Sequence, residues 1–244
     1  MSTILDSPGI APAQVGGIRR RPTLESGDRL TRTEFERRYS HRPDIKKAEL
    51  IEGVVYVMTS PVRIIEHGSP HSHIIGWLVA YEAATPGVQS GDNSTIRLDM
   101  DNEPQPDGLL RVLPEFGGQS GTDQDGYVES APELVAEVAA STASYDMHSK
   151  LNSYRRNAVQ EYLVILTEER QVKWFRLREG QYVELTPDTE GVVHSEVFPG
   201  LRLDTQAFLA GNMARVLEVL QRGIATAEHA AFVERLRQAG GKRS

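Results

Sequence analysis

One short apolar stretch, residues 134–140 (LVAEVAA), constrains the fold of this chain most strongly. A continuous apolar run of this length is typical of a strand buried on both faces, in a sheet covered by helices. Glu137 stands in the middle of the run, where a purely structural strand would carry Val or Leu. Burying an unpaired charge is very costly. Glu137 is therefore either paired with an arginine or capped by backbone groups, or it is a metal ligand or catalytic base.

The segment after this strand has the spacing of an amphipathic helix. After the polar break Ser141-Thr142, residues 143–157 carry an apolar stripe at i, i+4 and i+7 that continues to i+11. The stripe consists of Met147, Leu151, Tyr154 and Ala158. Asp146 and Lys150 stand four residues apart, so they are neighbours beside the stripe. Taken alone, this pair indicates a salt bridge on a solvated face.

A second carboxylate, Asp107, stands at the start of another predicted strand. Residues 105–112 (QPDGLLRV) have the pattern of a turn that leads into a strand. An acid at the mouth of one strand and an acid inside the next can converge on one hard cation. We therefore expect Asp107 and Glu137 to lie on adjacent strands, close enough to share an ion. Lys150, on the following helix, can serve the same site.

These residues, taken in order, resemble the PD-(D/E)XK nuclease superfamily and, within it, the family called "putative restriction endonuclease". The resemblance covers roughly residues 28–208. The matching segments are AELIEG (48–53), MTSP (58–61) with His71, QPD (105–107), LVAEV (134–138), Ser141-Thr142, Asp146, Lys150, Tyr154 and VQEY (159–162). In the superfamily the lysine usually follows the acid by two residues, where this chain has Ala139. The family moves that lysine onto the following helix, and Lys150 is the matching position.

The resemblance implies an α/β fold of the restriction-endonuclease-like type. Its mixed central sheet is flanked by helices. The residue pattern adds a peripheral β-hairpin, because two strands expected at 172–178 and 181–186 meet across a Gly-containing turn. It also adds a C-terminal helix, because apolar residues recur at helical intervals from 205 to about 238. The resemblance further implies a Mg²⁺-dependent (or Mn²⁺-dependent) endonuclease that hydrolyses the phosphodiester bonds of DNA.

The resemblance also assigns roles to individual residues. Asp107 and Glu137 would hold the metal, and Lys150 would orient the attacking water or neutralise developing charge. Glu49 would hold a second ion or position the water. The second-tier candidates are His71, Asp146 and Tyr154.

Two alternatives stay open. The first is a non-catalytic member of the fold that binds nucleic acid or a protein partner, since a fold does not determine a function. The second is a hydrolase of another phosphoester, which the acidic charge of the chain would suit. The formal net charge is -7, which argues against a broadly basic nucleic-acid surface.

The region before the first acidic strand leaves two further choices. Glu49 and Glu52 lie on opposite faces of the strand expected over 49–59, so only one of them can face a site. The resemblance favours Glu49, and the alternative is two exposed carboxylates at a sheet edge. His67, His71 and His73 form a cluster in the sequence. The spacing His71-x-His73 resembles the histidine pair of cupin metal sites, but the Glu expected four or five residues later is missing. We therefore expect these histidines to precede a helix over 71–84, with His71 in contact with substrate or a carboxylate.

Composition and patterning divide the chain into three parts. Residues 1–25 are rich in Gly, Pro, Ala and Ser and predict a disordered arm. Residues 26–208 predict the nuclease-like core, and residues 209–244 a C-terminal helical extension. The apolar stripe continues through this extension, which predicts a homodimer contact there.

The chain also carries signals about its compartment. It has no cysteine, which excludes disulfides and thiolate metal sites. No apolar run approaches the roughly 20 residues that span a bilayer, and a signal-peptide pattern is absent. We expect a cytoplasmic protein without a membrane partner.

Overall fold

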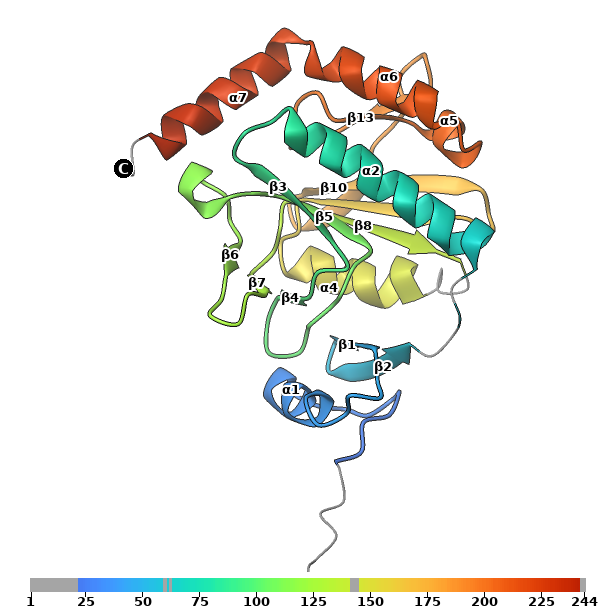
Figure 1. Ribbon diagram of the computed structural model, residues 1–244, viewed down its shortest axis with the longest axis vertical. Helices are drawn as coiled ribbons and strands as arrows, with labels where there is room; N and C mark the ends of the chain where they lie inside the picture. The colour runs from blue at the N-terminus through green and yellow to red at the C-terminus, as the bar shows by residue number, and fades with distance from the viewer. Residues whose placement is uncertain (1–21, 59–60, 62, 141–144, 242–244) are drawn as a thin grey trace, which may run out of the picture.

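The computed structural model describes residues 22–58, 61, 63–140 and 145–241. A six-stranded sheet forms the centre of the molecule, in the order β11-β10-β9-β8-β5-β3 (Figure 1). Its strands are β3 (Val88–Asp92), β5 (Gly108–Val112), β8 (Leu134–Ala139), β9 (Glu161–Leu166), β10 (Gln171–Arg178) and β11 (Gln181–Glu184). β8 and β9 are parallel and the other neighbours are antiparallel, so the sheet is mixed. This confirms the α/β class with a mixed central sheet.

The two middle strands, β8 and β9, are buried along their whole length. Successive side chains of a strand point to opposite faces, and β8 follows this rule. Leu134, Ala136 and Val138 belong to one core cluster, together with Trp77 of α2 (Ser69–Ala83). Val135 and Ala139 belong to a second cluster, with Tyr154 of α4 (Leu151–Arg156). Glu137 lies between Val135 and Ala139 in this alternation and therefore faces α4.

The N-terminal region differs from the expected single strand over 49–59. The structure has a hairpin of β1 (Lys47–Ile51) and β2 (Val54–Met58), preceded by the expected short helix, α1 (Arg32–Tyr39). Glu52 and Gly53 both have positive φ, at 52° and 73°. Two consecutive residues with positive φ are typical of the tight turn of a β-hairpin. The apolar pattern continues on both sides of this turn, so the sequence pattern alone predicted one strand.

Both helices that flank the sheet begin with a wider, π-helical turn. The helix expected over 71–84 is α2, which follows η1 (Ile64–Gly68). The helix expected over 143–157 is η3 (Asp146–Lys150) continued by α4, and Ser141-Thr142 lie outside the described residues. π-helical turns occur often at functional sites.

The predicted hairpin is β10–β11, and it forms one edge of the central sheet. The other strands of the described chain lie outside this sheet. β12 (Val192–His194), expected as an edge strand over 192–197, instead pairs with β13 (Arg202–Asp204) in a separate sheet. A third small sheet consists of β4 (Ile96–Arg97), β6 (Gly121–Thr122) and β7 (Val128–Glu129). A short 3₁₀ turn, η2, covers Pro114–Phe116.

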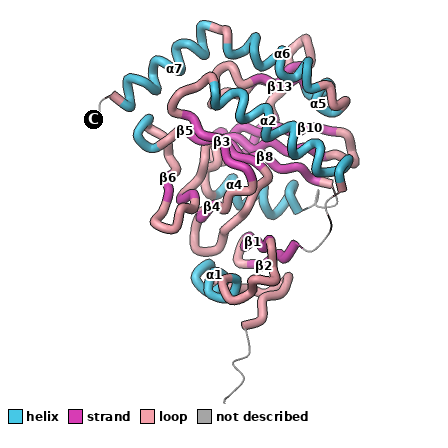
Figure 2. The backbone as a smooth tube through the Cα atoms, in the orientation of Figure 1, coloured by secondary structure: helices cyan, strands magenta, loops and turns pink. Residues whose placement is uncertain are grey.

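The C-terminal region contains three helices, where one was expected. These are α5 (Thr205–Leu209), α6 (Met213–Ile224) and α7 (Ala227–Gly240), and they follow one another along one side of the molecule (Figure 2). Their apolar side chains Val216, Leu220, Phe232 and Leu236 are buried in the same cluster as Trp77. The stripe that predicted a dimer contact thus packs on the chain's own core. Within the described parts of the chain, no helix combines the length and apolar character needed to cross a bilayer.

Candidate functional site

The buried lysine Lys150 forms ion pairs with three carboxylates from three different elements. Its Nζ lies 2.8 Å from Oε1 of Glu137 in β8 and 3.1 Å from Oε1 of Glu49 in β1. It also lies 3.5 Å from Oδ1 of Asp146, one turn earlier on η3. Lys150 is 3% exposed, so these ion pairs are screened little by solvent. The structure therefore brings together Glu49, Glu137, Asp146 and Lys150.

Two tyrosines position the carboxylates of this cluster. Tyr154 follows Lys150 by one helical turn, and its hydroxyl donates to Oε1 of Glu137 at 2.9 Å. Tyr145 donates to Oε2 of Glu49 at 3.4 Å. The backbone N–H of Gln105 donates to Oε1 of Glu49 at 2.7 Å. Glu49 is therefore fastened to the loop that carries Asp107.

The choice between the two glutamates of the first hairpin is clear from these contacts. Glu49 is fully buried beside Lys150. Glu52 sits at the hairpin turn and pairs with the half-exposed Arg156 at 3.1 Å. The turn at 52–53, which the sequence pattern did not reveal, directs Glu52 away from the cluster.

The electrostatics of the cluster follow from its burial. Burial raises the pKa of the Glu137 carboxyl above its usual value, and the Lys150 ammonium opposes that rise. Burial acts to lower the pKa of Lys150, but the Glu137 and Glu49 carboxylates outweigh it and raise that pKa well above its usual value. Lys150 is thus firmly charged. Three carboxylates around one ammonium still leave an excess of negative charge, which a proton or another cation would offset.

Asp107 lies directly before β5, the strand that pairs with β8. In the antiparallel register Gly108 is opposite Ala136, and the pairing ends there, one residue short of Asp107 and Glu137. The Oδ2 atom of Asp107 accepts a hydrogen bond from the backbone N–H of Val138 at 2.7 Å. The acid of β5 is therefore tied to the strand that carries Glu137.

The other oxygen of Asp107 faces two histidines. Oδ1 lies 3.4 Å from Nε2 of His67 and 3.3 Å from Nδ1 of His71. Burial acts to raise the pKa of Asp107, but the contacts with the two histidines outweigh it and hold that pKa below its usual range. The contact with Asp107 also raises the pKa of His71. His71, a second-tier candidate, thus contacts a carboxylate of the candidate site.

His67 belongs to the histidine cluster seen in the sequence but was not among the candidate site residues. Over the described part of the chain, one group of three or more His, Asp or Glu side chains has its potential ligand atoms within 4.8 Å of one another, and it is His67, His71 and Asp107. The signal that could have found it is the spacing His67-x-x-x-His71, because residues four apart share a helix face. The resemblance to cupin metal sites rested on the pair His71-x-His73 instead.

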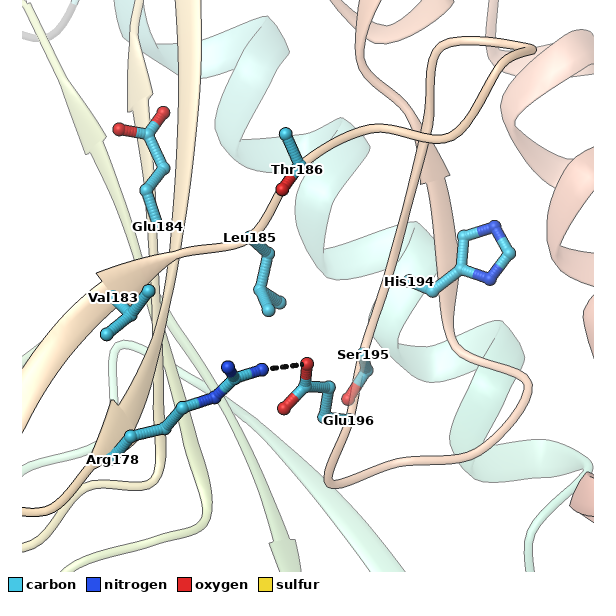
Figure 3. Close-up of a pocket in the computed structure, with 8 residues that line it drawn as sticks. All are labelled: Arg178, Val183, Glu184, Leu185, Thr186, His194, Ser195 and Glu196. Carbon is cyan, nitrogen blue, oxygen red and sulfur yellow. Dashed lines mark hydrogen bonds and ion pairs between the residues drawn. The ribbon is translucent and has the colours of Figure 1, made fainter.

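A separate pocket lies between the β10–β11 hairpin and the segment after β12 (Figure 3). Arg178 of β10 crosses it to pair with Glu196. None of the candidate residues lines this pocket. The candidate site is instead the buried cluster where β1, β5, β8, η1 and η3 meet.

Comparisons with known proteins agree with this architecture. Among solved structures, the chain is similar to a "putative nuclease" from Anabaena variabilis ATCC 29413, with a TM-score of 0.51 and 12% identity. The match covers 67% of this chain and 90% of that one, and at this identity it concerns the fold. A search of curated proteins finds no match.

The family comparison is more extensive. The family model Uma2, described as "Putative restriction endonuclease", matches residues 32–206. The matched range is more than half of the chain and includes Glu49, Asp107, Glu137 and Lys150. The chain therefore belongs to the Uma2 family.

Proposed function

We propose that this protein is a metal-dependent endonuclease that hydrolyses phosphodiester bonds in DNA. Its catalytic residues are Glu49, Asp107, Glu137 and Lys150. Membership of the Uma2 family supports a nuclease in general terms. The observation that carries the proposal is the buried Lys150 ammonium, 3.1 Å from Glu49 and 2.8 Å from Glu137, which lies on the strand to which Asp107 is hydrogen-bonded. A cytoplasmic location belongs to the same proposal, because a chain without cysteine suits a reducing compartment.

The donor groups of the site fit a divalent cation. Asp107 and Glu137 offer carboxylate oxygens, which Mg²⁺ and Mn²⁺ prefer. Both hydrogen bonds that described residues donate to Glu137 end on Oε1. The excess of carboxylates over ammonium groups also favours a cation. A bound cation would lower the pKa of a water molecule and offset charge on the phosphate.

The residues around that position have distinct tasks. Lys150, held by Glu137 and Glu49, offsets the negative charge that develops on the phosphate or orients the attacking water. Tyr154 fixes the Glu137 carboxylate, and Asp146 restrains Lys150 from the same helix. Glu49 either holds a second ion or positions the water. These tasks need no broad basic surface, which agrees with the net charge of -7.

The first test is cleavage of plasmid, linear and single-stranded DNA by the full chain with Mg²⁺, with Mn²⁺ and with EDTA. Lys150→Ala should lower the rate by about 10² to 10³, the usual effect of losing a group that stabilises the transition state. Lys150 also pairs with buried carboxylates, so circular dichroism and a melting curve must show that the variant is folded. His148→Ala is the matched control, because His148 is an exposed residue of the same helical segment.

The outcomes separate the alternatives. A folded wild-type chain that cleaves none of these substrates in either metal would favour a non-catalytic binding protein. Hydrolysis of simple phosphate esters without cleavage of DNA would favour a hydrolase of another phosphoester. A folded Lys150→Ala variant with the wild-type rate would remove Lys150 from the mechanism.

A further inference from the structure

The two histidines beside Asp107 have hydrogen bonds that determine which ring nitrogen carries a proton. Nδ1 of His67 lies 3.0 Å from the carbonyl oxygen of Val138. A carbonyl oxygen only accepts, so this nitrogen donates. Nε2 of His71 lies 2.7 Å from Oδ1 of Asp92, and a carboxylate also accepts. The side-chain amide of Asn93 is 3.4 Å from the same nitrogen but donates to Asp92 at 2.9 Å. Both outer nitrogens therefore carry hydrogen.

The inner nitrogens then point lone pairs at a carboxylate. In a neutral imidazole with one N–H, the other nitrogen is an acceptor. Nε2 of His67 and Nδ1 of His71 both face Oδ1 of Asp107, which is also an acceptor. Three acceptors that face one another repel unless a positive group lies between them. That group is either a proton on the imidazoles or a metal ion.

The distances favour the metal ion. The contacts of 3.4 and 3.3 Å with Asp107 are longer than the roughly 2.7–2.9 Å of a charge-assisted N–H···O bond. Ligand atoms that each lie about 2.1 Å from one ion are about 3.0–3.5 Å apart at tetrahedral or octahedral angles. The two separations from Asp107 Oδ1 fall in that range, and the three ligand atoms all lie within 4.8 Å of one another.

The backbone and the outer hydrogen bonds support the same assignment. His67 and His71 are four residues apart on the continuous η1–α2 helix, the spacing of the histidine pair in helical metal motifs. Metal-bound histidines usually donate their other N–H to a carboxylate or a backbone carbonyl, which fixes the ring. Asp92 does this for His71, and the Val138 carbonyl does it for His67.

We propose that His67 Nε2, His71 Nδ1 and Asp107 Oδ1 bind one divalent transition-metal ion, of the Mn²⁺, Co²⁺ or Zn²⁺ class, in preference to Mg²⁺. Imidazole nitrogens suit transition metals, whereas Mg²⁺ takes oxygen ligands. Because Asp107 is shared, the consequence for catalysis, a nuclease that works with Mn²⁺ better than with Mg²⁺, rests on the proposed function. Binding of the ion itself does not rest on it.

The test is a titration of the full chain, without a histidine tag, with CoCl2, followed by the visible absorption of bound Co²⁺. Wild type should bind one ion and keep it in a 100-fold excess of MgCl2. His67→Gln and His71→Gln should each weaken binding by more than about 100-fold, and the double variant should lose the absorption. His73→Gln, on the same helix but outside the cluster, should bind like wild type.

A second variant keeps the test decisive if a histidine variant does not fold. The Asp92 side chain is 56% exposed, and it would act on a bound ion only through its contact with His71. Asp92→Asn should weaken Co²⁺ binding by about 10- to 100-fold, the usual effect of losing a group that orients a ligand. If His71 were instead a cation held between two carboxylates, Asp92→Asn would leave Co²⁺ binding unchanged.

The results also separate this inference from the proposed function. Co²⁺ binding that depends on His67 and His71, without DNA cleavage in any metal, would uphold the inference and reject the nuclease. DNA cleavage by the wild type, together with Co²⁺ binding that persists in the double histidine variant, would uphold the nuclease and reject the histidine metal site. Displacement of Co²⁺ by the 100-fold excess of Mg²⁺ would overturn the metal preference.

Discussion

At the scale of single residues, Glu161 is an acid of the family-like segment 159–162 that stabilises the fold and lies outside the candidate functional site. Glu161 begins β9 and is fully buried. Its carboxylate accepts hydrogen bonds from Trp174 Nε1 at 3.1 Å and Ser195 Oγ at 2.8 Å. It also accepts from the backbone N–H groups of Glu196, at 2.7 Å, and Val197, at 3.1 Å. This acid joins the central sheet to a segment whose residues Ser195 and Glu196 line the pocket of Figure 3.

Glu161 should give the protein a pH-dependent stability. Burial raises its pKa from 4.5 to about 7, against the hydrogen bonds that lower it. Between those two pH values the folded chain holds a proton that the unfolded chain has lost. The contribution of Glu161 to the free energy of unfolding therefore falls as pH rises from about 4.5 to about 7, by on the order of 3 kcal/mol. Urea unfolding at several pH values across this range should show this contribution as the difference in slope between wild type and Glu161→Gln.

The control for this experiment removes a neighbouring surface carboxylate. Glu196 is 42% exposed and pairs with Arg178, so Glu196→Gln changes charge at the same place without reaching the buried site. The comparison between variants uses the slope of the unfolding free energy against pH. The absolute free energy of unfolding is not compared, because glutamine also replaces an acceptor oxygen with a donor. A Glu161→Gln profile as steep as that of wild type would contradict the assignment.

At the scale of elements, the closest approach in the C-terminal region is between α6 and the turn before β13. A Cβ on Gly223 of α6 would overlap with the carbonyl oxygen of Gly200. Gly200 itself has φ +89°, which side-chain-bearing residues rarely adopt. These two glycines let α6 pack against the backbone that leads into β13. The packing holds Val216 and Leu220 against Trp77 in the core.

Gly223→Ala should destabilise the protein, because backbone must move to admit the methyl group. A loss of at least about 2 kcal/mol is expected from overpacking of this kind. Gly76 is the matched control, since it also lies inside a helix, α2, but has open space around a Cβ. Gly76→Ala should stabilise the protein by about 0.5–1 kcal/mol. Thermal unfolding of the two variants and of wild type measures both changes in stability. Equal changes for the two variants would contradict the close contact between Gly223 and Gly200.

At the scale of the whole molecule, the last two helices complete the core. Val216, Leu220, Phe232 and Leu236 are buried in the core cluster that also contains residues of α2 and the central sheet. Each such side chain contributes about 1.5–3 kcal/mol on burial, or about 6–12 kcal/mol together. That sum is as large as the typical total stability of a domain, about 5–15 kcal/mol. We therefore expect the region that the sequence marked as an extension, 209–244, to act as part of the fold.

A chain that ends at Ala210 should consequently lose cooperative folding. Circular dichroism during urea unfolding should show one sharp transition for the full chain and none for the shortened one. A shortened chain with the full transition would contradict the role of α6 and α7.

The homodimer stays a prediction, and light scattering of the full chain tests it. A mass of 27.1 kDa, that of one chain, would contradict the dimer.

Local patterns were sufficient for part of this protein. The apolar run 134–140 predicts a strand buried on both faces, and β8 is one. The alternation along that strand places Glu137 on the face toward α4, and the helical spacing places Lys150 and Tyr154 one turn apart on the same side. These properties depend on residues a few positions apart, whose geometry follows from the period of a strand or a helix.

Other features depended on the tertiary structure, because they arise between residues far apart in the chain. The turn at 52–53 decides that Glu49, not Glu52, lies beside Lys150. The approach of η1 to the start of β5 decides that His67 faces Asp107. The apolar stripe of α6 and α7 was visible in the sequence, but its partner was not. By itself the sequence determined which residues share a face, and the tertiary structure decided what that face meets, since periodicity carries no record of long-range contacts.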